Sequence, residues 1–217
     1  TTLPATLTGD ETISAALDVL FEHPNTAPFI AQQLIQRMTT SNPSPAYVRR
    51  VADAFDRGEY VLPDGDTVGS GTRGDMRAVW AAILVDAEYL APTAVSDPTF
   101  GKVREPVIRF NHWARMSDVP TVNLVNGTTT VDGFVLNSQN GDRLGQRPFT
   151  SPSVFNFYRP GYVAAGSETA QAGLVAPELQ ITTTTSVLSY AKFMRDLVFR
   201  DPGAGGSGGT YGLIGDY

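Results

Sequence analysis

Apolar residues recur at three- and four-residue spacing in a series of short segments along this chain, and proline, glycine or a capping residue bounds most of them. This spacing places the apolar side chains on one face of an α-helix. Such a face is normally turned towards the core of the protein. The pattern therefore predicts a mainly α-helical fold in which several short helices pack together.

Four such segments fill the first hundred residues, and the first has Ile13, Leu17, Leu20 and Phe21 on one face, which we expect to be buried. Residues suited to capping a helix precede the segments: Asp10, Asn25, Ser44 with Pro45 behind it, and Thr72 with Asp75. Gly58 is suited to end the third helix. The fourth is apolar over a wide arc that includes Trp80, which predicts a central helix with more apolar surface than one neighbour can cover.

Two further helical segments lie in the second half of the chain. We expect one at about 103–116, because Pro106 is tolerated only in a first turn, and the other at 183–200. Between them, Asn126-Gly127 separates two short runs rich in Val and Thr, which predicts a β-hairpin.

The length of 217 residues and the hydrophobic content of 41% are enough for one compact core. Glycine and proline are numerous, at 21 and 15 residues, which favours long loops. We therefore expect a multi-helical single domain at residues 1–200 with a small β-hairpin and long ordered loops. The glycine-rich residues 201–217 are expected to form a flexible tail.

Charge and composition exclude several classes of function. The net charge of −6 disfavours a nucleic acid partner, because proteins that bind nucleic acids neutralise phosphates with Lys and Arg. Cysteine is absent, which excludes disulfides, thiolate nucleophiles and thiolate metal sites. No apolar run is long enough to span a bilayer, so we expect no membrane span.

We expect no cofactor and no bound metal. Residues 69–74 have the letters of a dinucleotide-binding loop, but the apolar strand that this motif requires before its first glycine is missing. Asp64 and Asp66 have the oxygen ligands that calcium prefers, without the spacing or the terminal glutamate of an EF-hand. A solvated acidic turn is the favoured interpretation, and a calcium site is the alternative.

The segment around residue 105 carries the candidates for catalysis. Glu105, Arg109 and His112 follow one another at spacings of four and three, so they can lie on one stripe of a helix and do acid–base work. A surface ion pair beside a histidine is the commoner alternative. Lys102 and Arg104, where this helix begins, are candidates for an anion pocket, with solvated charge as the alternative.

Aromatic residues are densest between Phe149 and Tyr162. Phe155, Phe157 and Tyr158, with Asn and Arg among them, are candidates for stacking on the sugar rings of a glycan. The alternative is that they hold a long loop on the helical core. We favour this structural role and expect Phe155 and Phe157 to be mostly buried.

Four motifs give the chain a family resemblance: HPNTAPFIA at 23–31, SNPSPAYV at 41–48, GKVREPV at 101–107 and SPSVFNFYRP at 151–160. In this order they resemble the C-terminal half of the bacterial domain-of-unknown-function family 1800, over nearly the whole chain. Members are typically about twice as long, so the chain resembles a fragment or a processed half.

The resemblance implies no reaction and no catalytic residues. It does imply a periplasmic, secreted or cell-surface location, because relatives commonly carry export signals and are often encoded beside an exported sulfatase-like protein. We favour a non-enzymatic interaction or scaffold protein of the bacterial envelope, and the alternative is a hydrolase acting on an extracellular polysaccharide or another polymer. The expected partner is another polypeptide or the missing N-terminal half, with self-association and a glycan as further alternatives.

Overall fold

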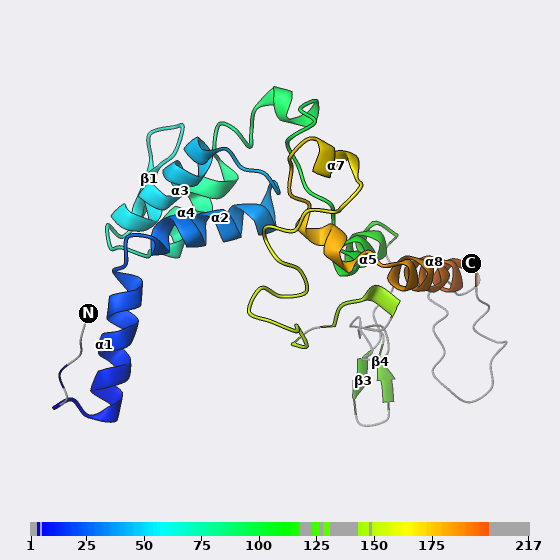
Figure 1. Ribbon diagram of the computed structural model, residues 1–217, viewed down its shortest axis with the longest axis horizontal. Helices are drawn as coiled ribbons and strands as arrows, with labels where there is room; N and C mark the ends of the chain where they lie inside the picture. The colour runs from blue at the N-terminus through cyan, green and yellow to red at the C-terminus, as the bar shows by residue number, and fades with distance from the viewer. Residues whose placement is uncertain are drawn as a thin grey trace. The chain divides into compact units, whose positions relative to one another are not determined.

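The computed structural model describes residue 4 and residues 6–117, 123–125, 128–130, 143–147 and 149–199, with the backbone alone at 123–125, 128–130 and 196–199. Helices predominate, and Figure 1 shows the elements in chain order: α1 (Gly9–Phe21), α2 (Thr26–Met38), α3 (Pro45–Arg57), β1 (Glu59–Val61), β2 (Thr67–Gly69), α4 (Met76–Leu84), η1 (Pro92–Val95), α5 (Pro106–Met116), β3 (Asn123–Val125), β4 (Thr128–Thr130), α7 (Glu168–Gln171), η2 (Pro177–Ile181) and α8 (Thr184–Phe199). The predicted mainly α-helical fold with a small β-hairpin is confirmed.

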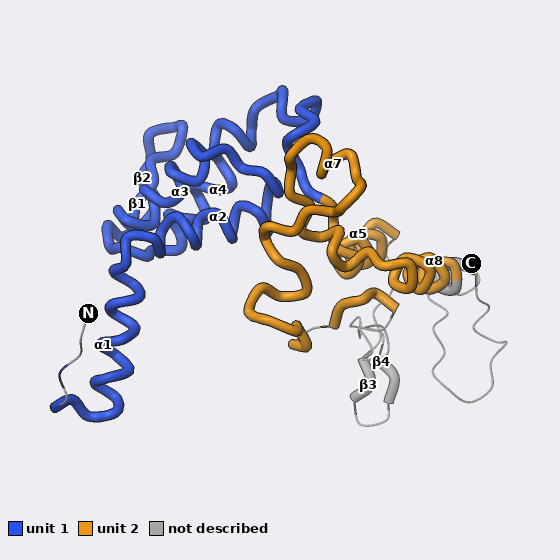
Figure 2. The backbone as a smooth tube through the Cα atoms, viewed as in Figure 1, with its two compact units in different colours: residues 1–102 blue, residues 103–217 orange. Residues whose placement is uncertain are grey.

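The chain divides into two compact units, coloured separately in Figure 2. Unit 1 is Thr1–Lys102 and unit 2 is Val103–Tyr217. Whether the two fold together as the single domain expected at 1–200 stays a prediction. The tail expected at 201–217 lies outside the described residues.

The core of unit 1 is formed by α2, α3 and α4. Small residues of α2, such as Ala27 and Ala31, are fully covered and let the helices approach one another closely. The larger side chains of the same cluster are Ile35, Tyr47, Val51, Phe55, Val79 and Ile83. Each large apolar side chain buried here stabilises the fold by about 1.5–3 kcal/mol.

Helix α3 begins and ends where local chemistry predicts. The side chain of Ser44 accepts a hydrogen bond from the amide of Tyr47, and Pro45 occupies the first turn. Gly58 ends the helix with φ +66°, a left-handed conformation that glycine adopts without strain. A Cβ atom there would lie 1.9 Å from the backbone oxygen of Thr72, so glycine is also required for space.

A second hairpin, which the sequence analysis did not predict, follows α3 directly. Strands β1 and β2 pair antiparallel, with Tyr60 opposite Val68. The turn is closed by a hydrogen bond from the amide of Leu62 to the carbonyl of Asp66, at 2.8 Å, and Gly65 has φ +95°. A turn could have been predicted from Pro63-Asp64-Gly65, because these residue types favour turns. The strands could not, because three residues are too few for an alternating pattern to be recognised.

Unit 2 has a smaller core between α5 and α8. The rings of Phe110 and Phe193 lie 5.3 Å apart, and Leu144 is buried with them. Strands β3 and β4 form the expected hairpin, in which Leu124 is opposite Thr129, while its Asn126-Gly127 turn lies outside the described residues.

Two predictions about α1 are wrong. Its cap is Thr8, not Asp10, because Thr8 and Glu11 satisfy each other's backbone amides as a capping box. The face expected to be buried is exposed: Ile13, Leu17 and Leu20 are 62%, 59% and 65% accessible.

Smaller differences concern the other helices. Asn25 stands at the start of α2 without a side-chain capping bond, and the cap of α4 is Asp75 alone, through the amide of Arg77. Helix α5 begins at Pro106, three residues later than expected. The wide apolar arc of α4 contacts α2, α3 and both strands of the β1–β2 hairpin, with Trp80 packed against the core cluster, so one neighbour does not cover it alone. Helix α1 carries an uncovered apolar face in unit 1, and Met76 and Leu84 on α4 are also exposed.

Candidate functional sites

The first candidate site is centred on the carboxylate of Glu105, immediately before α5. The hydroxyl of Tyr158 donates to one of its oxygens, and the side-chain amide of Gln146 donates to the other. Gln146 is in turn held by the amide of Val107, which donates to its side-chain oxygen at 3.3 Å. Pro106, the first residue of α5, fixes the backbone between Glu105 and Val107, which both take part in these bonds.

The two donors come from the interior of unit 2. Gln146 and Tyr158 are both buried, whereas Glu105 is half-buried. A hydrogen bond to a charged group contributes about 1.5–3 kcal/mol to stability. A buried donor that cannot move also fixes the orientation of the charged group that it binds. The carboxylate is therefore held in one orientation by residues that solvent does not reach.

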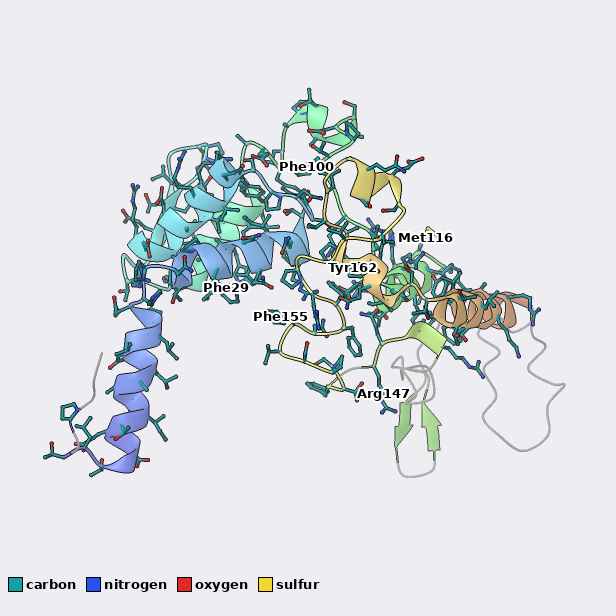
Figure 3. The ribbon with its side chains drawn as sticks, in the orientation of Figure 1. Phe29, Phe100, Met116, Arg147, Phe155 and Tyr162 are labelled. Carbon is teal, nitrogen blue, oxygen red and sulfur yellow. The ribbon has the colours of Figure 1, made fainter. Side chains whose placement is uncertain are left out.

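A cavity of about 200 Å³ lies beside this carboxylate. Its lining combines charged, polar and aromatic side chains: Glu105, Val107, Gln146, Arg147, Phe149, Ser151, Asn156 and Phe157. The loop in Figure 3 that carries the labels Arg147 and Phe155 contributes most of these residues, all of which belong to unit 2.

The loop backbone is strained at this cavity. Phe149 and Asn156 have φ values of 60° and 68°, and they are the described residues other than glycine with a left-handed backbone. Asn tolerates this conformation, but for Phe it costs about 1–2 kcal/mol. Moreover, the Phe149 side chain is fully exposed. Strain at an exposed aromatic residue is typical of binding sites.

The structure gives Glu105, Arg109 and His112 three different sets of partners. The guanidinium of Arg109 lies 4.7 Å from the ring centre of Tyr190 on α8, a cation–π contact. The ring of His112 accepts a hydrogen bond from Arg104, because a guanidinium can only donate. Among these three candidates, Glu105 alone lines the cavity, so the acid–base stripe is not assembled.

The two basic residues proposed for an anion pocket also have other partners. The ammonium group of Lys102 donates to the carbonyl oxygen of Arg37, at 2.8 Å, near the C-terminal end of α2. Arg104 is bonded to His112 and belongs to the other unit. These contacts give both cations a structural role.

The aromatic loop is buried differently from the expectation. Phe155 is exposed, with 37% of its surface accessible, so its expected burial is wrong, and Phe157 is half-buried. Tyr158 is the residue that enters the interior, where it reaches Glu105. Proline-bounded loops do not alternate like strands, so sequence alone gave no way to decide which ring points inwards.

Asp64 and Asp66 lie in the turn between β1 and β2. A carboxylate oxygen of Asp64 accepts the amide of Asp66 at 3.1 Å, and both residues are exposed. Within the described part of the chain, no group of three or more acidic or histidine residues is arranged to hold a metal ion. The same residues include no helix whose length and apolar character would let it cross a membrane.

The second candidate site is the exposed face of α1. We call Ile13, Leu17 and Leu20 the α1 apolar stripe. No residue of this helix, all of which the structure describes, is buried. Its last turn is attached to the rest of unit 1. Arg73 donates a hydrogen bond to the carbonyl of Phe21 at 3.0 Å, and the rings of Phe21 and Phe55 lie 5.8 Å apart.

Gln146, Arg147 and Ser151 line the site and were not among the candidates that sequence reasoning singled out. Gln146 lies 41 positions from Glu105 along the chain, and no motif surrounds it. Phe149 belongs to the aromatic cluster, but its left-handed backbone has no sequence signal of its own.

Comparison with known proteins gives one positive finding. No curated protein and no solved structure matches the chain. A family model does match, over residues 1–204 of 217, which is nearly the whole length. The chain therefore belongs to the family described as Protein of unknown function (DUF1800).

Proposed function

We propose that this protein is a non-enzymatic interaction protein of the bacterial envelope or the cell exterior, and that α1 is its docking helix. The observation that carries the proposal is the α1 apolar stripe, with three large aliphatic side chains exposed in register on one face. Contiguous exposed apolar surface of this kind is typical of protein interaction sites.

The geometry of α1 suits a helix that lies in a groove. Residues 13, 17 and 20 follow the spacing by which amphipathic helices contact an apolar groove. At 3.6 residues per turn, Glu11 and Asp18 lie on the opposite side, where they remain solvated when the stripe is covered. The last turn is anchored to unit 1, so a partner on the stripe is held in a fixed place on the molecule.

Charge favours a different polypeptide over a second copy of this chain. Helix α1 and its C-cap residue carry four acidic residues and no basic ones: Asp10, Glu11, Asp18 and Glu22. Although Glu11 and Asp18 remain solvated, pairing two copies through α1 would set two acidic helices with no basic residues side by side, and like charges oppose association. The partner is therefore a polypeptide with an apolar groove bordered by Lys or Arg.

The alternative is a hydrolase acting on an extracellular polysaccharide. It is favoured by the carboxylate of Glu105 at the wall of a cavity. Glycoside hydrolysis ordinarily needs two carboxylates on either side of the bond. Among the described lining residues Glu105 is the only carboxylate, so this chemistry would need a second one from elsewhere.

The proposed location rests on the export signals of relatives and is tested by cell fractionation.

The test is affinity purification from the producing bacterium after reversible crosslinking in intact cells. The interaction variant carries Ile13→Ser, Leu17→Gln and Leu20→Gln. The matched control carries Val95→Ser, Val154→Ser and Val187→Ser, which also remove three exposed aliphatic side chains but leave α1 intact. We expect the wild type and the control to retain the same discrete partner and the interaction variant to lose it.

Two outcomes would contradict the proposal. One is a partner that is retained equally by all three proteins, since α1 would then have no part in binding. The other is hydrolysis of a polysaccharide by the purified wild type that Glu105→Gln abolishes, which would establish the enzymatic alternative. Circular dichroism of each variant checks that the helices are retained.

A further inference from the structure

We propose that the cavity beside Glu105 binds one ring of a neutral carbohydrate chain, without cleaving it. This site lies in unit 2, whereas the docking helix α1 belongs to unit 1. The proposal therefore stands on residues that the proposed docking function does not use.

The charges around the cavity favour an uncharged ligand. The lining contains one carboxylate, on Glu105, and one guanidinium, on Arg147. Their opposite signs leave no net charge to attract a phosphate, a sulfate or a cation. The ligand is therefore recognised by hydrogen bonds and apolar contact.

The polar groups suit hydroxyls. The carboxylate of Glu105 only accepts hydrogen bonds and the guanidinium of Arg147 only donates them, while the Ser151 hydroxyl and the Asn156 amide do both. Adjacent hydroxyls of a sugar each donate and accept, so a mixed set of this kind can satisfy them. The fixed orientation of Glu105, maintained by buried Tyr158 and Gln146, means that little ordering is needed on binding.

The apolar part of the lining suits the C–H face of a sugar ring. Phe149 and Phe157 contribute the aromatic surfaces, and Phe149 presents its whole ring to solvent. Burial in the protein core does not explain this side chain, and its backbone is held at φ 60°. A ring stacked on it from solvent would cover the aromatic surface that the fold leaves open.

The size of the cavity limits the ligand to one ring at this position. Pockets for drug-sized molecules begin at about 300 Å³, whereas this cavity is about 200 Å³. One ring of a longer chain fits this size, with the neighbouring rings outside. The lone carboxylate among the described lining residues favours binding over hydrolysis.

The test uses the full 217-residue chain and four neutral probes: cellotetraose, laminaritetraose, maltotetraose and chitotetraose. Saturation-transfer NMR detects weak binding, and calorimetry gives its strength. We expect at least one probe to bind at millimolar concentration or below. Phe149→Ala should weaken it by roughly tenfold, which corresponds to about 1.4 kcal/mol.

The control is Phe29→Ala, which removes an exposed phenylalanine from α2 of unit 1 (Figure 3) and should leave the affinity unchanged. Glu105→Gln should also weaken binding, because it replaces one accepting oxygen by a donor. Failure of all four probes at millimolar concentration would overturn the proposal. So would binding that Phe149→Ala and Glu105→Gln leave intact, or cleavage of a bound probe. None of these results depends on α1.

Discussion

The hydroxyl of Tyr158 donates a hydrogen bond to the carboxylate of Glu105, across 53 positions of the sequence. This bond ties the aromatic loop to the start of α5. Tyr158→Phe removes the donor and leaves the ring in place, so we expect it to destabilise the protein by about 1.5–3 kcal/mol. Denaturant unfolding followed by circular dichroism measures the change.

The matched control for this prediction is Tyr162→Phe, which removes a hydroxyl from a half-exposed tyrosine of the same loop (Figure 3). It should change the free energy of unfolding by no more than about 0.5 kcal/mol. Equal effects of the two substitutions would show that the bond to Glu105 has no special part in stability.

Helix α3 owes its end to Gly58, where both φ and space require glycine. Gly58→Ala should destabilise the protein by several times the roughly 1 kcal/mol expected from backbone conformation alone. Gly65→Ala is the control, because Gly65 also has a positive φ but has open space around it. Similar melting temperatures for the two variants would show that the close approach to Thr72 relaxes without cost.

Stability should fall at alkaline pH because of Tyr47. Burial raises the pKa of Tyr47 to about 12, and its hydroxyl donates to the carbonyl of Ile83 at 2.6 Å. The pKa of an unfolded tyrosine is about 10, so the folded state favours the protonated form. This contribution is complete below about pH 10 and is lost as the pH rises towards about 12.

The control for the pH prediction is Tyr47→Phe. It should lower stability by about 1 kcal/mol at neutral pH and show a shallower loss between pH 10 and 12. Tyr60, whose pKa burial also raises, remains in both proteins and accounts for a residual slope. Identical alkaline slopes for the wild type and the variant would exclude Tyr47 as the cause.

Features set by residues close together in the sequence could be predicted, whereas contacts between distant residues could not. The boundaries of α3 follow from Ser44, Pro45 and Gly58, each of which acts within a few residues, and they were predictable. The partners of Glu105 were not, because Gln146 and Tyr158 lie 41 and 53 positions away.

The apolar face of α1 illustrates a second limit. The periodicity of Ile13, Leu17 and Leu20 correctly predicts a helix with one apolar face. It contains no information on what covers that face, because the spacing is the same for a helix buried in its own core and one that docks on a partner. In the structure these side chains are exposed, so the described residues of the chain do not cover them.

The central claim is that a partner covers the α1 apolar stripe, and position-resolved photo-crosslinking in the producing bacterium tests it most directly. A photoreactive amino acid is placed, one position at a time, at residues 13, 17 and 20 and, as controls, at 11, 15 and 18 on the opposite side of the helix. We predict crosslinks to one discrete polypeptide from the first set and none from the second. Crosslinks from both sets alike, or from neither, would contradict the claim.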